Sequence, residues 1–169
     1  MSSIPAFDPT QPKGPLLGAL SWAGRQRPVT WFLVNVGNKI DPVLMRATGG
    51  RLKTTVNAPT VLVTHTGARS GKQRTTPLAY FTDGDDVILI ASAGGAPKHP
   101  AWFRNVMANP EVELWAKGSG GRYRAREAEG EERARLWKLA TDYYPGFASY
   151  QERATERRIP VVVCSPVEG

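Results

Sequence analysis

Short runs of β-branched and apolar residues, separated by polar turns, occupy the middle of the chain. The segments 60–66, 75–82 and 86–92 are each rich in such residues. The letters DGDD between the last two segments are typical of a hairpin turn, because glycine and aspartate readily adopt the backbone angles of a tight turn. The pattern therefore predicts an antiparallel meander.

A second pair of strands is predicted on either side of the letters KGSGG. Residues 111–115 and 122–126 alternate apolar with charged side chains. A two-residue turn at 119–120 would set Glu113 opposite Arg126 across the sheet. The arginines of the second strand are then expected on a solvent-exposed face rather than in a ligand site.

The first helical pattern lies in residues 28–45, where apolar side chains recur near helical spacing and Lys39 and Arg46 lie beside them. Such an amphipathic segment either packs on the core or also touches a membrane surface. Its apolar residues are Trp31, Phe32, Val36, Ile40, Val43 and Leu44.

Three shorter helices are predicted further along the chain. Pro100 suits the first position of a buried helix that ends at the Asn-Pro pair 109–110, and the acidic pair 131–132 suits the start of the next. Residues 148–157 form the last helix, and the β-branched run 159–164 predicts a central strand. The sum is an α+β fold, mainly β: a small barrel of five or six mostly antiparallel strands with inserted helices and an N-terminal amphipathic helix.

Length and composition restrict the choice of class. With 169 residues, of which 41% are apolar, the chain suits one core. We expect residues 1–50 to form a Pro-rich lead and the helical segment, and residues 51–169 to form the barrel. A single cysteine and two histidines are too few for a disulfide framework or a zinc site, so no metal is expected. No secretory signal or long apolar run is recognisable, which predicts a cytoplasmic protein.

Positive charge is concentrated in the first half of the chain. The net charge is +7, yet residues 1–82 hold ten basic and two acidic residues while residues 83–169 hold twelve basic and thirteen acidic. This distribution predicts an anionic partner. Proteins that bind single-stranded nucleic acid usually add stacking aromatics, and residues 46–79 contain none, so a compact anion is expected rather than nucleic acid.

The richest anion-binding stretch is THTGARSGKQRTTPL, residues 64–78, which combines hydroxyls and cations with two glycines and no carboxylate. It is not a nucleotide-hydrolase loop, since Gly67 and Gly71 enclose one residue too few and Gln73 stands where a magnesium-binding hydroxyl would follow Lys72. An ordinary hairpin loop is the plain alternative. The density of donors favours a phosphate site instead.

Three separated motifs resemble one family. The stretches LVTHTGARSGKQRTTPLAYF, ILIASAGGAPKHPAWFRNVMANPEVEL and YYPGFASYQERATERRIPVVVCSPV occur in the order found in deazaflavin-dependent nitroreductases and quinone reductases, actinobacterial enzymes with a split β-barrel. The resemblance covers roughly residues 55–167. It implies hydride transfer from reduced coenzyme F-420 to quinones, nitroaromatics or conjugated enones, and a basic loop that holds the phosphate and acidic tail of that coenzyme.

The resemblance also implies which residues form the site. From the residues themselves, the proton for catalysis is expected from solvent or from a tyrosine hydroxyl, with Tyr144 and Tyr150 the best placed. Together with Ala79 and Phe147 these tyrosines would bind the acceptor. Ala79 and Phe147 stand where relatives carry tyrosines. The coenzyme would be lined by Ala68, Arg69, Ser70, Lys72, Arg74, Thr75, Thr76, Pro77, Leu78, Ala79, Ile90, Ala91, Ser92, Ala93, Ala101, Trp102, Phe103, Arg104 and Asn105.

Other functions agree with the same residues. A flavin-mononucleotide enzyme of the broader split-barrel class would use the same basic loop for its phosphate, and a non-enzymatic binder of anionic lipid or nucleic acid would use the basic first half. His65 is expected to be a strand residue rather than a base, and Cys164 a small buried side chain. We expect a monomer or a homodimer, cytoplasmic or peripheral at the inner face of the membrane.

Overall fold

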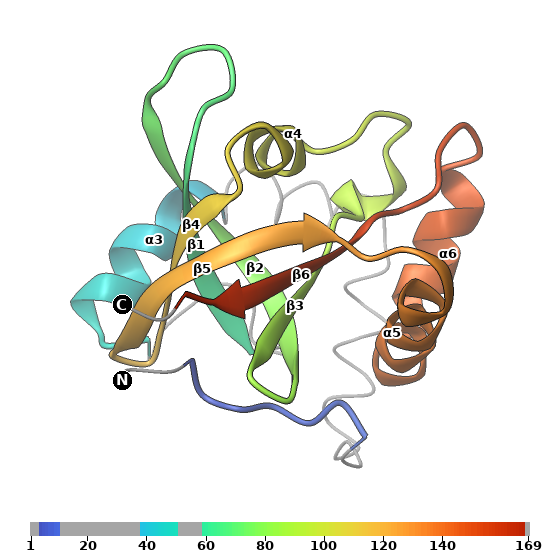
Figure 1. Ribbon diagram of the computed structural model, residues 1–169, viewed down its shortest axis with the longest axis horizontal. Coiled ribbons are helices and arrows are strands. Elements are labelled where there is room, and N and C mark those ends of the chain that lie inside the picture. The colour runs from blue at the N-terminus through green and yellow to red at the C-terminus, as the bar shows by residue number, and fades with distance from the viewer. Residues whose placement is uncertain (1–3, 11–37, 51–58, 168–169) are drawn as a thin grey trace.

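Six antiparallel strands form a closed barrel in the computed structural model, which describes residues 4–10, 38–50 and 59–167 (Figure 1). The strands follow one another around the barrel in the order β1, β2, β3, β6, β5, β4. They are β1 (Thr60–Thr66), β2 (Gln73–Asp83), β3 (Asp86–Ile90), β4 (Glu111–Ala116), β5 (Ser119–Glu127) and β6 (Val161–Pro166). The predicted meander and its DGDD turn are confirmed, since Asp83 pairs with Asp86.

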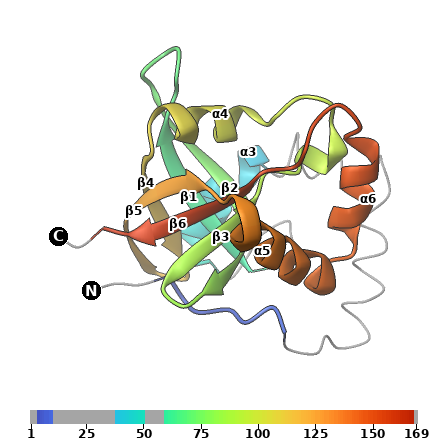
Figure 2. The ribbon, with the colours of Figure 1, turned by 45° about the vertical axis from the view of Figure 1, so that its right-hand side comes forward.

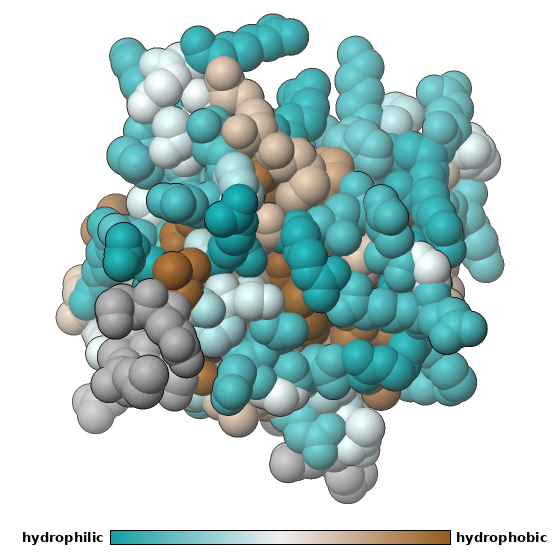
Figure 3. Space-filling view, in the orientation of Figure 1, coloured by the Kyte–Doolittle hydropathy of each residue, from teal (hydrophilic) through white to brown (hydrophobic). Residues whose placement is uncertain are grey.

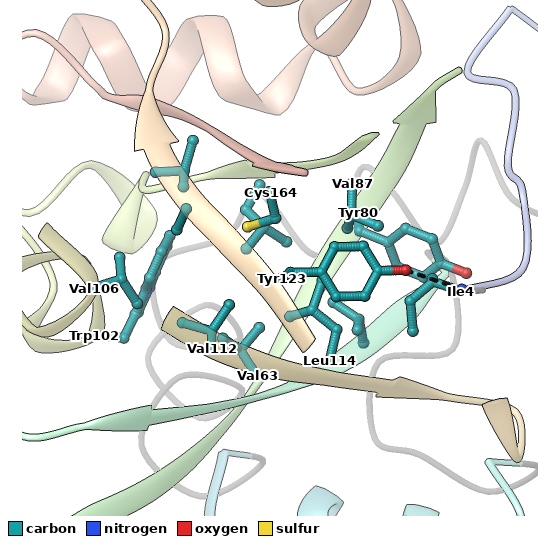
Figure 4. Close-up of a cluster of buried hydrophobic side chains, with 14 of the residues drawn as sticks. Ile4, Val63, Tyr80, Val87, Trp102, Val106, Val112, Leu114, Tyr123 and Cys164 are labelled. Carbon is teal, nitrogen blue, oxygen red and sulfur yellow. Dashed lines mark hydrogen bonds between the residues drawn. The ribbon is translucent and has the colours of Figure 1, made fainter. Parts of the chain in front are cut away.

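The barrel encloses a core of alternate side chains from every strand, and Figure 4 shows part of it. Val63, Val87 and Val162 are at most 1% exposed. β6 lies between β3 and β5, as expected for a central strand, and its Cys164 is free and buried. Burial raises the pKa of the Cys164 thiol to about 12.

The described residues near the N-terminus complete this core. Ile4 is 5% exposed and lies in the same cluster as the barrel side chains. Its backbone N–H donates to the hydroxyl of Tyr123 at 3.2 Å (Figure 4). The hydroxyl of Tyr80 donates to the Pro5 carbonyl at 2.9 Å. Residues 4–7 therefore pack as part of the barrel.

The turn between β4 and β5 differs from the prediction. It lies at Lys117 and Gly118, so Glu113 pairs with Arg122 rather than with Arg126. Lys117 and Gly118 have φ of 49° and 82°, the left-handed pair that a tight hairpin turn requires. The predicted face is confirmed, because Arg122, Arg124 and Arg126 are all exposed.

Helix α3 (Asn38–Ala47) also differs from the prediction. Ile40 and Val43 are 48% and 72% exposed, whereas Asp41 and Met45 are each 1% exposed. The helix contacts β2. Its buried side is the one that carries Asp41 and Met45, which are one turn apart and share a face. The expected apolar face is therefore wrong for Ile40 and Val43. Its earlier part, Trp31, Phe32 and Val36, lies outside the described residues.

The remaining helices are α4 (Ala101–Ala108), α5 (Gly130–Tyr143) and α6 (Gly146–Arg153), with a short 3₁₀ turn, η2 (Ala93–Gly95). Pro100 precedes α4 as its N-cap rather than opening it. α6 begins and ends earlier than the predicted 148–157. In the described parts of the chain, no helix is long and apolar enough to cross a membrane.

Two views show where the helices lie. α4 crosses one end of the barrel beside the β1–β2 loop, while α5 and α6 pack together at the side and α6 lies next to the turn before α4 (Figures 1 and 2). The β1–β2 loop, α4, the 91–99 segment and α6 therefore follow one another along the same edge of the molecule.

Candidate functional site

The loop between β1 and β2 folds back on itself. The Gly67 N–H donates to the Lys72 carbonyl at 2.9 Å, and the Gly71 N–H donates to the Gly67 carbonyl at 2.8 Å. A Cβ on Gly67 would stand 2.6 Å from Ser70 Oγ and 3.5 Å from Arg74 Nε, so the side chains of Ser70 and Arg74 lie close against the backbone of Gly67.

The loop presents cations to solvent. Arg69, Lys72 and Arg74 are exposed, and none of the ion pairs found in the described part of the chain includes them. In the orientation of Figure 1, extended hydrophilic side chains surround the tip of this loop (Figure 3). Three exposed cations beside a glycine-rich turn suit a phosphate or a carboxylate.

His65 and Asn105 fasten this loop to α4. Asn105 Oδ1 accepts from the Ala68 N–H at 3.0 Å, and Asn105 Nδ2 lies 3.3 Å from His65 Nδ1. Because the Asn105 amide donates to Nδ1, His65 carries its proton on Nε2, which lies 3.1 Å from Thr76 Oγ1. Burial and the positive charge of Arg74 lower the pKa of His65, so the neutral form is favoured. His65 is thus a strand residue, as predicted, but one that positions the loop.

The predicted residues of β2 do not share one face. Thr76 and Leu78 point the same way as Tyr80, toward the barrel interior, whereas Thr75 pairs with Thr64 on the outside at 3.1 Å between hydroxyls. Pro77 is buried and Ala79 is exposed. From one side of the strand, only alternate residues of this stretch are therefore within reach.

The segment after β3 makes an unusual turn. Ala93, Gly94 and Gly95 have φ of 48°, 64° and 82°, three left-handed residues in succession. Ile90, Ser92 and Ala93 are half-buried, while Ala91 is fully buried. A side chain on Gly95 would stand 2.7 Å from the Tyr150 carbonyl oxygen, so this turn lies directly against α6.

The three predicted acceptor-site aromatics form one cluster. The Tyr144 and Tyr150 hydroxyl oxygens are 3.2 Å apart, and Phe147 lies edge-on to both rings, at centroid distances of 5.2 and 6.1 Å. Tyr150 is 7% exposed, and the Arg153 guanidinium lies 4.8 Å from its ring centroid. The structure thus brings the cluster beside the 93–95 turn.

The four predicted parts of the site, which are the β1–β2 loop, α4, the segment after β3 and the aromatic cluster, lie next to one another along one edge of the molecule. Ala68 bonds to Asn105 on α4, the His99 ring lies 5.1 Å from that of Phe103, and Gly95 touches Tyr150. On α4, Ala101 and Arg104 face solvent, whereas Trp102 and Phe103 are buried. Trp102 and Phe103 therefore expose little of their side chains to a ligand at the surface.

Comparison with known proteins names the family. Residues 39–166 match the family model described as F420H(2)-dependent quinone reductase. The chain belongs to the F420H(2)-dependent quinone reductase family. The Mycobacterium tuberculosis F420H(2)-dependent quinone reductase Rv1261c is 37% identical over 130 residues, which cover 74% of this chain and 87% of that protein.

Solved structures agree with this assignment. An F420-H2 dependent reductase, FDR-A, aligns at a TM-score of 0.58 with 46% sequence identity, covering 63% of this chain and 94% of that one. The structure of a domain-swapped dimer aligns at a TM-score of 0.61 with 40% identity, covering 75% of this chain and 94% of that one. The predicted family and split β-barrel are confirmed.

Membership of the F420H(2)-dependent quinone reductase family decides the reaction and the coenzyme. Hydride passes from reduced coenzyme F-420 to a small quinone acceptor, and the alternatives of a flavin-mononucleotide enzyme and a non-enzymatic binder are not favoured. Arg69, Lys72 and Arg74 fit an anionic coenzyme. None of them has an ion-pair partner among the described residues, so each can bond to a phosphate or carboxylate oxygen.

Two long-range contacts of the site could not be predicted from the sequence. The contact of Ala68 with Asn105 joins residues 37 apart, and the contacts of Arg157 with Ala91 and Ser92 join residues 66 and 65 apart. The motifs identified Asn105 and Ser92, but nothing in the spacing indicated which distant residue would bind each of them.

Proposed function

We propose that the β1–β2 loop and the exposed side of α4 bind the anionic parts of coenzyme F-420. Arg69 and Arg74 would bond to the phosphate, with Lys72 nearer the acidic tail. The observation that supports this is the set of exposed cations, without an ion pair to any described residue, on a loop that Asn105 fastens to α4. A preformed anion site avoids the cost of ordering a loop on binding.

We further propose that the deazaflavin ring lies along residues 90–93, between α4 and the aromatic cluster. The coenzyme supplies the hydride. Reduction of a quinone to a hydroquinone by hydride also needs one proton, and the Tyr150 hydroxyl would donate it to an acceptor oxygen. Tyr144, which is 3.2 Å away and half-buried, would then return a proton from solvent to Tyr150.

The direct test is a titration of the purified protein with reduced coenzyme F-420, followed by a panel of quinones, enones and nitroaromatics. We expect saturable binding and fastest turnover with quinones. Enones and nitroaromatics are further expected acceptors, since they share the conjugated electron-poor centre that accepts hydride. Binding without any turnover would contradict the proposal.

Replacing Tyr150 by phenylalanine should lower kcat by about tenfold while the Kd for the coenzyme stays unchanged. The ring remains in the cluster, so only the oriented hydroxyl is lost. The measurement is steady-state turnover with a quinone alongside coenzyme binding. Tyr143→Phe is the matched control, because Tyr143 packs on Phe7 outside the aromatic cluster. Full activity of both Tyr150→Phe and Tyr144→Phe would remove these tyrosines from the mechanism.

We also propose a contact of α3 with the inner face of the cell membrane, with the rest of the protein in the cytoplasm. Ile40 and Val43 are exposed, and Arg46 on the same helix is exposed as well. Exposed apolar side chains next to a cation suit an anionic lipid surface. Such a contact would bring the enzyme to lipophilic quinones.

The double substitution Ile40→Asp and Val43→Asp should reduce co-sedimentation with anionic vesicles severalfold, because the apolar contact is replaced by repulsion. Val167→Asp is the control, since Val167 is 41% exposed but lies after β6. Equal sedimentation of all three proteins would show that α3 makes no lipid contact.

We expect a monomer or a homodimer. The solved domain-swapped dimer of a relative with 40% identity supports the dimer, and sedimentation velocity distinguishes the two.

A further inference from the structure

The Arg157 guanidinium binds the turn after β3 through several bonds at once. Its Nε donates to the Ala96 carbonyl at 2.9 Å, and its Nη2 donates to the Ser92 carbonyl at 2.7 Å. Its Nη1 donates to the Ala91 carbonyl at 3.2 Å and lies 3.3 Å from His99 Nδ1. One side chain from the loop before β6 therefore joins both ends of the 91–96 segment.

Residues 91–96 adopt a backbone conformation that their sequence alone does not favour. Ala93 is one of two residues other than glycine with positive φ in the described chain, and Gly94 and Gly95 continue the left-handed turn. Local bonds are few: the Gly95 N–H donates to the Ser92 carbonyl at 2.9 Å, and the Ala96 N–H donates to the Ala93 carbonyl at 3.2 Å. Such a conformation persists only where other contacts fix it.

Only arginine can make this set of contacts. A guanidinium has five N–H donors in a rigid plane, whereas a lysine ammonium is a point charge on a flexible stem. Because arginine has donors only, His99 must accept at Nδ1, which makes it neutral with its proton on Nε2. Burial lowers the pKa of Arg157, but a guanidinium stays charged in proteins.

We propose that Arg157 is a positioning residue that preforms the 91–96 turn as the seat of the deazaflavin ring. The inference rests on the proposed function, which places the ring along residues 90–93. The turn contacts Tyr150 through Gly95, and His99 packs on Phe103. The segment before α4 lies between α4 and α6 (Figure 2). By holding this segment, Arg157 would fix how the ring seat, the aromatic cluster and α4 lie relative to one another.

The test compares Arg157→Lys with Arg158→Lys, the same change at the neighbouring, exposed arginine. Hydrogen exchange of the Gly95 and Ala96 amides is measured by NMR without coenzyme, and the Kd for reduced coenzyme F-420 is measured separately. For Arg157→Lys we expect exchange about tenfold faster and a Kd about tenfold higher. For Arg158→Lys we expect neither change.

The two measurements separate the possible failures. Faster exchange with an unchanged Kd would mean that Arg157 orders the turn but that the ring does not use it, which overturns the proposal. Unchanged exchange overturns it as well. If the unsubstituted protein does not bind the coenzyme at all, the proposed function fails, whatever the exchange shows.

A second variant covers the case in which Arg157→Lys does not fold. Adding Ala93→Gly to Arg157→Lys removes the side-chain strain of the turn and should restore a folded protein. That double variant should keep fast exchange and a raised Kd, because glycine does not replace the lost contacts. A Kd equal to that of the unsubstituted protein would overturn the proposal.

Discussion

Replacing Arg74 by alanine should weaken binding of reduced coenzyme F-420 by about 1.5–3 kcal/mol, roughly a 10- to 150-fold rise in Kd. Arg74 lies where β2 leaves the loop, paired with His65 across the strands and close to Gly67. It has no carboxylate partner among the described residues, so its charge is available to a phosphate. Isothermal titration or fluorescence of the coenzyme measures the change.

The control for Arg74→Ala is Arg124→Ala, which removes another exposed arginine, from the outer face of β5. Its Kd should change less than twofold, roughly 0.4 kcal/mol. Arg74→Ala should also raise the pKa of His65, because the nearby positive charge is lost. Equal, small effects of both substitutions on Kd would show that the loop is an ordinary solvated turn.

Replacing Gly95 by alanine should lower the free energy of unfolding by about 2–5 kcal/mol, which corresponds to a melting temperature roughly 5–15 °C lower. Its φ of 82° disfavours any side chain, and a Cβ there would stand 2.7 Å from the Tyr150 carbonyl oxygen and 3.1 Å from its Cα. Both contacts are with the backbone of α6, which cannot rotate away. Thermal unfolding followed by circular dichroism measures the loss.

Gly84→Ala is the control for Gly95→Ala. Gly84 has a φ of 61° in the exposed turn between β2 and β3, and a Cβ there would have nothing within 4 Å. It should cost only about 1–2 kcal/mol, the part due to the left-handed backbone. A similar loss for both variants would mean that α6 moves freely away from the 93–95 turn.

Much of the barrel could be predicted because strand alternation is a local signal. The bounds of β1 agree with the predicted 60–66, and Pro100 and Glu131 each lie within one residue of an observed helix start. The β4–β5 turn was misplaced because KGSGG offers several glycines, while the turn uses a left-handed lysine at Lys117. Nothing in the composition favours lysine at that position.

The faces of α3 and the site contacts could not be predicted, since both depend on distant packing. The spacing of Ile40 and Val43 is helical, but it does not say which side meets β2, and the structure buries Asp41 instead. Likewise the resemblance identified residues 68–79 and 101–105 separately. Their meeting through Asn105 follows from how α4 crosses the end of the barrel.

The position of β6 has a consequence for how the protein is made. The ribosome makes β6 (Val161–Pro166) after the other five strands. Until β6 is made, β3 and β5 each have one unpaired edge. Val162 and Cys164 are also missing from the core up to that point. A premature stop or a proteolytic cut ahead of Val161 should therefore leave an open sheet whose two free edges recruit other chains, giving aggregates rather than a smaller folded enzyme.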